Sequence, residues 1–158
     1  MRQALELAER ASFQGETPVG ALLVEQNTII GSGGNARGAQ GSPLEHAEVL
    51  ALRRAARRTG DWRFPGATMY VTLEPCSMCT GALLQARVSK LVFGAYNRET
   101  GCCLSLLNLA DVPGARTQLT VVGGVLENEC QEKLNRFFSL RRGGRAWLNA
   151  LDSKASRG

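Results

Sequence analysis

The sequence contains two short motifs that can bind one metal ion only if the fold brings them together. His46-Ala47-Glu48 holds the only histidine of the chain, and Pro75-Cys76-Ser77-Met78-Cys79 lies well downstream of it. One imidazole nitrogen and two thiolates form a ligand set that suits Zn²⁺. We therefore expect a fold in which the segment at His46 lies against the segment that carries Cys76 and Cys79.

The local sequence around the cysteines favours metal binding. Cys76 and Cys79 are three positions apart at the predicted start of a helix, so they share one helix face. Free backbone N–H groups and the helix dipole at such a start favour thiolates over thiols. A second helix start near His46 can bring the imidazole to the same metal.

Three protein ligands leave one tetrahedral position open, which is typical of catalytic rather than structural zinc sites. A water molecule in that position ionises near pH ~7. Glu48 lies two residues after His46 and points in a different direction on the helix, so it can move a proton instead of binding the metal. We predict one Zn²⁺ per chain, with His46, Cys76 and Cys79 as ligands and Glu48 as the catalytic residue.

Other uses of the cysteines stay open at this point. Cys102, Cys103 or Cys130 could supply a fourth ligand and close the site as a structural zinc centre. A redox role for Cys76 and Cys79 would leave Glu48 without a purpose. An odd number of five cysteines is a poor disulfide framework and indicates a reducing compartment.

Periodicity of the apolar residues indicates alternating helices and strands, as in a layered α/β domain. We expect helices at 2–13, 43–58 (with Ser42 as N-cap), 77–86 and 127–142, and strands at 19–24, 28–33, 67–73, 90–95 and 119–122. The chain is interpreted as a single domain over 1–142, followed by a basic C-terminal tail over 143–158, flexible in this prediction.

The net charge of +5 is concentrated near the end of the chain. Beyond Ser139 the basic residues are Arg141, Arg142, Arg145, Lys154 and Arg157, and the only acidic residue is Asp152. Such a segment is either a solvated tail or a binding surface for a polyanion such as nucleic acid. No apolar run reaches the roughly 18 residues of a membrane span, and Glu6 and Glu9 do not fit a signal peptide, so we expect a cytoplasmic protein without membrane contact.

Taken together, His-x-Glu and Pro-Cys-x-x-Cys resemble the signature of the cytidine deaminase-like superfamily of zinc deaminases. Within it, the chain is similar to the tRNA adenosine deaminases over nearly its whole length. Further matching segments are Thr17-Pro18-Val19-Gly20-Ala21, Asn35, Tyr70-Val71-Thr72-Leu73-Glu74, Val92-Phe93-Gly94-Ala95 and Phe137-Phe138. The resemblance implies a three-layer α/β/α fold, with a mixed five-stranded sheet flanked by helices, and a homodimer. The implied reaction is deamination of adenosine to inosine at the wobble position of a tRNA anticodon loop.

The resemblance also implies roles for individual residues. Asn35 matches the residue that hydrogen-bonds the base, Val19 matches a wall of the base pocket, and backbone groups near Ala47 and Cys76 could stabilise the intermediate. Phe138, Arg141 and Arg142 fall in a terminal helix that lies against the anticodon loop in such enzymes.

Several positions depart from the family pattern. Ser42-Pro43-Leu44-Glu45 and Arg116-Thr117 replace the residues that are usual there, and Asn97 stands where relatives often carry Asp. As a hypothesis, Asn97 weakens the discrimination against deoxyribose, which would make single-stranded DNA a competing substrate. Two further functions stay open, namely deamination of guanine or cytosine as a free base and a non-catalytic zinc module that only holds RNA.

Overall fold

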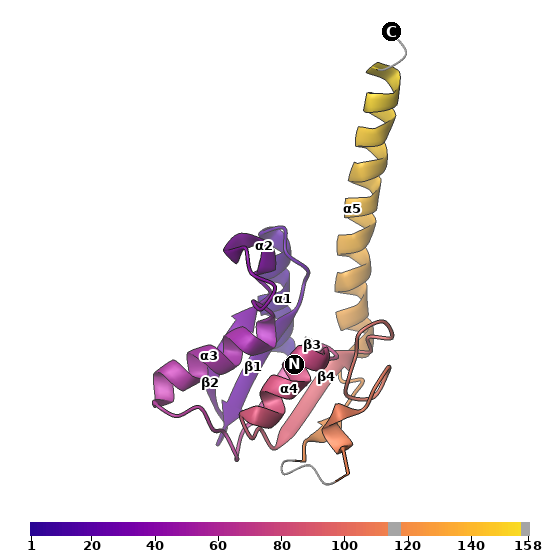
Figure 1. The fold of residues 1–158 in the computed structure, drawn as a ribbon. Helices are drawn as coiled ribbons and strands as arrows, with labels where there is room; N and C mark the ends of the chain where they lie inside the picture. The colour runs from indigo at the N-terminus through magenta and orange to yellow at the C-terminus, as the bar shows by residue number, and fades with distance from the viewer. Residues whose placement is uncertain (114–117, 156–158) are drawn as a thin grey trace.

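The computed structural model describes residues 1–113 and 118–155, with side chains described as far as Arg142. Along the chain the elements are α1 (Arg2–Phe13), β1 (Gly20–Glu25), β2 (Thr28–Gly34), α2 (Arg37–Gln40), α3 (Ala47–Thr59), β3 (Thr68–Leu73), α4 (Ser77–Gln85), β4 (Lys90–Ala95), the 3₁₀ turn η1 (Leu109–Asp111), β5 (Thr120–Val122) and α5 (Glu127–Ala155). Figure 1 shows α5 projecting far beyond the sheet.

The strands form one mixed five-stranded sheet in the order β2-β1-β3-β4-β5. β1 pairs antiparallel with β2 and with β3, whereas β3, β4 and β5 run parallel. Gln26 and Asn27, both with positive φ, make the tight turn between β1 and β2. The parallel part needs crossover connections, and α4 provides the one between β3 and β4.

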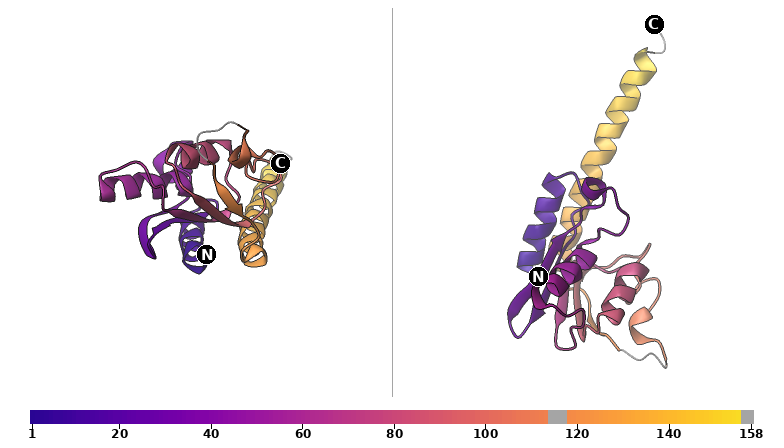
Figure 2. Two further views of the ribbon diagram at one scale, coloured as in Figure 1. Left: turned by 90° about the horizontal axis from the view of Figure 1, so that it is seen from below. Right: turned by 60° about the vertical axis from the view of Figure 1, so that its left-hand side comes forward.

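Helices cover both faces of the sheet, which gives three layers (Figure 2). On one face α3 and α4 enclose the larger apolar core, whose fully buried members include Leu23, Met69, Val71, Leu83 and Phe93. On the other face α1 and α5 pack against the sheet around Leu5, Ala95, Cys130 and Leu134. The predicted three-layer α/β/α class with a mixed five-stranded sheet is confirmed.

Glycines let the helices approach the sheet closely. A Cβ added at Gly20 would lie 2.1 Å from the carbonyl oxygen of Ala4 in α1. One added at Gly31 would lie equally close, 2.1 Å, to the carbonyl oxygen of Ala51 in α3. A methyl group at Gly20 or Gly31 would push the facing helix away from the sheet. These two glycines therefore set the spacing between the helix layers and the sheet.

Two element boundaries differ from the prediction by more than one residue, and one short helix was not predicted. α3 begins at Ala47 with His46 as N-cap, not at Pro43 with Ser42 as N-cap, because the Glu45 carbonyl is already bound by the Ala36 N–H (3.0 Å). The loop expected before Ser42 contains the short helix α2. The last helix does not end at Arg142 but continues to Ala155, since the glycine pair at 143–144 weakens a helix without terminating it.

The unusual pair Arg116-Thr117 lies outside the described residues, and so does Arg157 of the basic segment. Within the part of the chain that the structure describes, no helix is long and apolar enough to cross a bilayer.

We expect Gly31→Ala to lower the free energy of unfolding by about 3 kcal/mol, because the new methyl group would force α3 away from the sheet. Urea unfolding measures the effect. Gly81→Ala is the matched control: no atom lies within 4 Å of its added Cβ, so alanine should leave stability unchanged or raise it by about 1 kcal/mol. Equal effects of the two substitutions would contradict the close-packing argument.

Candidate metal centre and the cavity beside it

Two helix starts meet at the metal motifs. His46 is the N-cap of α3 and Cys76 is the N-cap of α4, and both have extended backbone angles. Neither side chain bonds the end of its own helix, so both are free to turn toward each other. Cys79 follows within the first turn of α4 and is buried.

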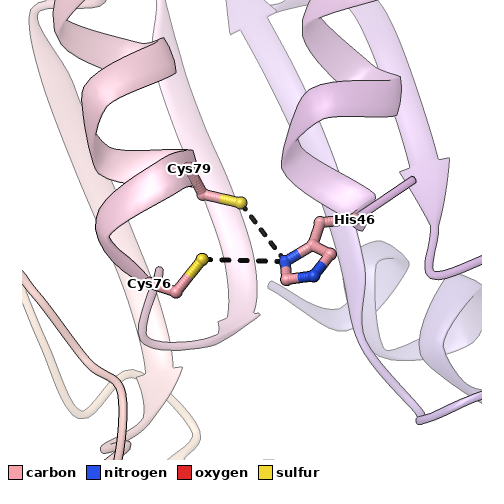
Figure 3. A group of neighbouring side chains, drawn as sticks. All are labelled: His46, Cys76 and Cys79. Atoms are coloured by element: carbon pink, nitrogen blue, oxygen red, sulfur yellow. Dashed lines mark hydrogen bonds between the residues drawn. The ribbon is translucent and has the colours of Figure 1, made fainter. Parts of the chain in front are cut away.

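The three side chains converge on one point (Figure 3). His46 Nδ1 lies 3.8 Å from Cys76 Sγ and 3.4 Å from Cys79 Sγ. All three ligand atoms lie within 4.8 Å of one another. Zinc bond lengths place nitrogen and sulfur ligands about 3.5 Å apart at the corners of a tetrahedron. The donor set and its spacing therefore fit Zn²⁺.

The protonation of the group also suits a cation. Hydrogen bonds with Cys79 and His46 lower the pKa of Cys76 to about 3. The bond with Cys76 and burial together raise the pKa of Cys79, so the pair retains one proton. The hydrogen bond with Cys76 raises the pKa of His46 against the effect of its own burial. A metal ion would take the place of these shared protons.

No fourth protein ligand joins this group among the residues that the structure describes. Cys103 Sγ lies 3.2 Å from Thr80 Oγ1, Cys102 Sγ lies 3.4 Å from the carbonyl oxygen of Thr100, and Cys130 belongs to the core on the other face. All five cysteines are free thiols. The group therefore has the open geometry of a catalytic site, not the closed Cys₃His arrangement.

Glu48 lies in the first turn of α3 and is 4% exposed. Burial raises the pKa of its carboxyl group, and the nearby His46 opposes that shift. Glu48, His46 and Cys76 all line one cavity of about 1180 Å³. The cavity is thus lined by a buried carboxyl group and by two of the three side chains of the candidate metal centre.

Most of the predicted substrate contacts line this cavity. Those that do are Val19, Asn35, Asn97 and Phe138. Ala47 is fully buried in the larger core, so only its backbone can contact a substrate. Arg141 lies beside a neighbouring, smaller pocket, where its guanidinium donates to the Gly15 carbonyl (2.6 Å) and covers the Phe137 ring. Arg142 is exposed and lines neither cavity.

The Asn97 side chain is occupied within its own loop. Its Nδ2 donates to Thr100 Oγ1 (2.7 Å), and its Oδ1 accepts from the backbone N–H groups of Glu99 and Thr100 (3.2 and 3.1 Å). These bonds make Asn97 the organising residue of a turn at the cavity rim.

The role of Glu74 was missed by sequence reasoning, yet this residue fixes that loop beside the candidate metal centre. It is 1% exposed, and its carboxylate accepts from the backbone N–H groups of Asn97, Cys103, Leu104 and Ser105 and from the Ser105 hydroxyl. Gly101 leaves room for the carboxylate, since an added Cβ would lie 2.5 Å from it. The signal in the sequence was an acidic residue at the end of an apolar strand, directly before Pro75-Cys76.

Glu45 is a second residue that sequence reasoning missed. Both of its oxygens accept from the guanidinium of Arg53 at 2.8 Å. Its carbonyl accepts from the N–H of Ala36. These bonds connect Glu45, the residue before His46, to α3 and to the segment between β2 and α2.

Comparison with known proteins gives a consistent result. The MafB19-like deaminase family matches residues 1–140. A tRNA-specific adenosine deaminase of Haemophilus influenzae is 47% identical over 143 residues, which are 90% of this chain and 83% of that protein. A tRNA-specific adenosine deaminase of Bacillus subtilis is 44% identical over 138 residues, 87% of this chain and 86% of that one.

Solved structures show the same fold. A structure from a study of A-to-I editing by tRNA:A34 deaminases superposes with a TM-score of 0.82 at 36% identity, covering 85% of this chain and 97% of that one. A guanine deaminase from Nitrosomonas europaea has a TM-score of 0.72 at 21% identity, covering 86% of this chain and 81% of that one, and so shares the fold alone.

Glu74→Gln should lower the free energy of unfolding by about 2–3 kcal/mol at neutral pH, because an amide cannot accept from all of these donors. Glu99→Gln, on the exposed part of the same loop, is the control.

Burial raises the pKa of Glu74, but hydrogen bonds from Ser105, Asn97 and Leu104 outweigh it and leave the pKa below 4.5. The difference between wild type and variant should be complete above pH 4.5 and shrink as the pH falls through the lowered value. Chemical denaturation at several pH values tests both statements.

The metal content of cysteine variants tests the ligand set. Cys79→Ser should abolish stoichiometric zinc binding, whereas the double variant Cys102→Ser/Cys103→Ser should retain about one zinc per chain. Elemental analysis of the purified proteins gives the ratio. Loss of zinc in the double variant would mean that one of these two thiols completes a closed site.

Proposed function

The chain belongs to the MafB19-like deaminase family, and on this premise we propose that it deaminates adenosine to inosine at the wobble position of a tRNA anticodon loop. One observation carries the proposal: the group His46, Cys76 and Cys79 has three ligands and adjoins a cavity that Glu48 also lines. The tRNA-specific adenosine deaminases that are 44–47% identical to the chain support the choice of substrate.

Zn²⁺ held by His46 Nδ1, Cys76 Sγ and Cys79 Sγ would supply the Lewis acidity that makes water a nucleophile near neutral pH. Glu48 handles the protons. Its carboxylate takes one proton from the attacking water and delivers it to the ring nitrogen N1 of adenine. It then takes the second proton of that water, from the oxygen now bonded to C6, and delivers it to the amino group, which leaves C6 as ammonia. Water and adenosine are consumed, and inosine and ammonia are formed. Burial of Glu48 keeps these transfers away from bulk solvent.

The remaining residues bind and orient the base. Asn35 and Val19 line the cavity together with His46, and in this proposal they hydrogen-bond and pack against the adenine. Phe138 lines the same cavity from α5 and is 45% exposed, so it can stack on a neighbouring base. Bases of an anticodon loop are already unpaired, which lowers the free energy needed to extrude one into the cavity.

Contacts with the RNA backbone, the assembly and the location belong to the same proposal. Arg141 and Arg142 in α5 contribute positive charge toward the phosphates of the RNA. The protein acts as a homodimer in the cytoplasm. Leu104, on the loop that Glu74 holds, and Leu106 and Leu107, directly after it, have exposed side chains that form an apolar surface, and a second copy would cover this surface.

Glu48→Gln should retain about one zinc per chain and reduce inosine formation at least ~10²-fold, because an amide cannot accept the proton. The substrate is an anticodon stem-loop RNA with adenosine at the wobble position, and inosine is quantified by mass spectrometry after nuclease digestion. Glu6→Gln, on the exposed face of α1, is the matched control and should behave as wild type.

The same assay separates the competing substrates. A zinc-loaded wild type that is silent on the RNA but releases ammonia from guanine or cytosine would replace the proposal with a free-base deaminase. Product from a DNA hairpin of the same sequence would support the hypothesis about Asn97, and absence of product at high enzyme concentration would end it.

A further inference from the structure

Glu16 is a buried carboxylate that the proposed reaction has not used. It follows the end of α1, is 7% exposed, and is held by its backbone N–H on the Ala11 carbonyl (3.0 Å). One carboxylate oxygen accepts from the Asn35 side-chain amide (Nδ2–Oε2, 3.2 Å), and the other from the backbone N–H of Ala39 in α2 (2.7 Å). Glu16 thus stands directly behind the side chain assigned to the base.

The contact determines which way the Asn35 amide faces. A carboxylate only accepts hydrogen bonds, so the amide must turn its NH₂ group to Glu16. The carbonyl oxygen Oδ1 then remains, and it has no protein partner among the described residues. Asn35 is 7% exposed and lines the cavity with His46 and Glu48, and its backbone N–H is fixed on the Val19 carbonyl (2.9 Å). If the Asn35 amide were reversed, its NH₂ group would face the cavity in place of Oδ1, and the cavity would meet hydrogen-bond donors instead of an acceptor.

We propose that Glu16 is a positioning residue that determines base specificity by holding the Asn35 amide in this orientation. The inference rests on the proposed function, in which a purine base enters the cavity. An acceptor at Oδ1 matches a base that carries an amino group and opposes a base that carries a carbonyl oxygen at the same place. Adenine has such an amino group, whereas hypoxanthine, the base of the product inosine, has a carbonyl oxygen there. Glu16 thereby favours binding of substrate over retention of product.

The surroundings keep Glu16 from rotating. Its Oε1 is bound to the Ala39 N–H, and Gly38 provides the room, since a Cβ added there would lie 2.9 Å from Oε1. In Glu16→Gln, the amide oxygen can still accept from Ala39, and the new NH₂ group then faces Asn35. Two NH₂ groups cannot pair, so Asn35 must reverse. The substitution thus preserves shape and hydrogen bonds but inverts what Asn35 presents to the cavity.

A double-mutant cycle distinguishes this role from a merely structural one. Glu16→Gln, Asn35→Ala and the double variant are compared in kcat/KM on the anticodon stem-loop RNA and in inhibition by free inosine. We expect Glu16→Gln to retain zinc and thermal stability, lose about 10- to 100-fold in kcat/KM, and bind inosine more tightly than wild type does. In the Asn35→Ala background the same substitution should have no further effect.

Two further variants sharpen the cycle. The methyl group of Gly38→Ala would contact the Glu16 carboxylate but not Asn35. We expect this substitution to lower kcat/KM less than Glu16→Gln does, and to have no effect in the Asn35→Ala background. Glu9→Gln, which removes an exposed carboxylate that pairs with Lys133 (2.7 Å), should leave activity unchanged. Additive losses from Glu16→Gln and Asn35→Ala would overturn the proposal, because Glu16 would then act without Asn35.

Nuclear magnetic resonance tests the orientation without any substrate. In wild type, one Asn35 side-chain amide proton should show a scalar coupling to the Glu16 carboxylate carbon, and Glu16→Gln should remove it and shift both amide protons. Unchanged Asn35 signals would overturn the inference. A wild type that is silent on the RNA would refute the proposed substrate only, and these spectra would then decide the role of Glu16 by themselves.

Discussion

The candidate site depends on one constraint of the fold: the N-termini of α3 and α4 must lie close together, so that the side chains at these two helix starts can meet. The N-cap residues of α3 and α4 are His46 and Cys76. Neither side chain makes a capping hydrogen bond to its own helix, and each points toward the other. The sheet makes this possible, because β2 and β3 both pair antiparallel with β1 and end where β1 begins, so the segments that lead to α3 and α4 emerge at the same end of the sheet. The glycines that bring α3 onto the sheet then fix where His46 stands relative to Cys76 and Cys79.

Around this point the loops are held by buried carboxylates. Glu16 holds α2 and Asn35, Glu45 holds the segment before His46, and Glu74 holds the loop 97–105. Loops expose many backbone N–H groups, and a carboxylate with two oxygens can satisfy several of them at once. A cavity walled by loops can in this way be as well ordered as one walled by strands. Because these carboxylates accept hydrogen bonds, they also direct which polar atoms stay free to face the cavity.

The sequence predicted what is chemically rare or periodic. A single histidine and a Cys-x-x-Cys pair stand out among 158 residues, and the apolar periodicity located every strand of the sheet. It did not predict the buried carboxylates, because Glu16, Glu45 and Glu74 look like surface residues until the fold supplies their donors. The predicted start of α3 is wrong for a related reason. Ser42-Pro43 is a good local helix start. In the fold, however, the Glu45 carbonyl accepts from the Ala36 N–H and the Glu45 carboxylate accepts from Arg53, and neither partner can be inferred from the sequence around Ser42.

Two loops at the cavity rim are held by different carboxylates, one by Glu16 and the other by Glu74, and this affects how such an enzyme can change over evolution. Each rim loop is anchored by its own acid, and the hydrogen bonds of Glu16 share no partner with those of Glu74. Substitutions that act on well-separated groups without shared partners combine additively. A lineage can therefore remodel one of these two loops at a time and explore new substrates without substituting His46, Cys76 or Cys79. The loop that orients Asn35 and the loop that carries Asn97 can in this sense be altered one without the other.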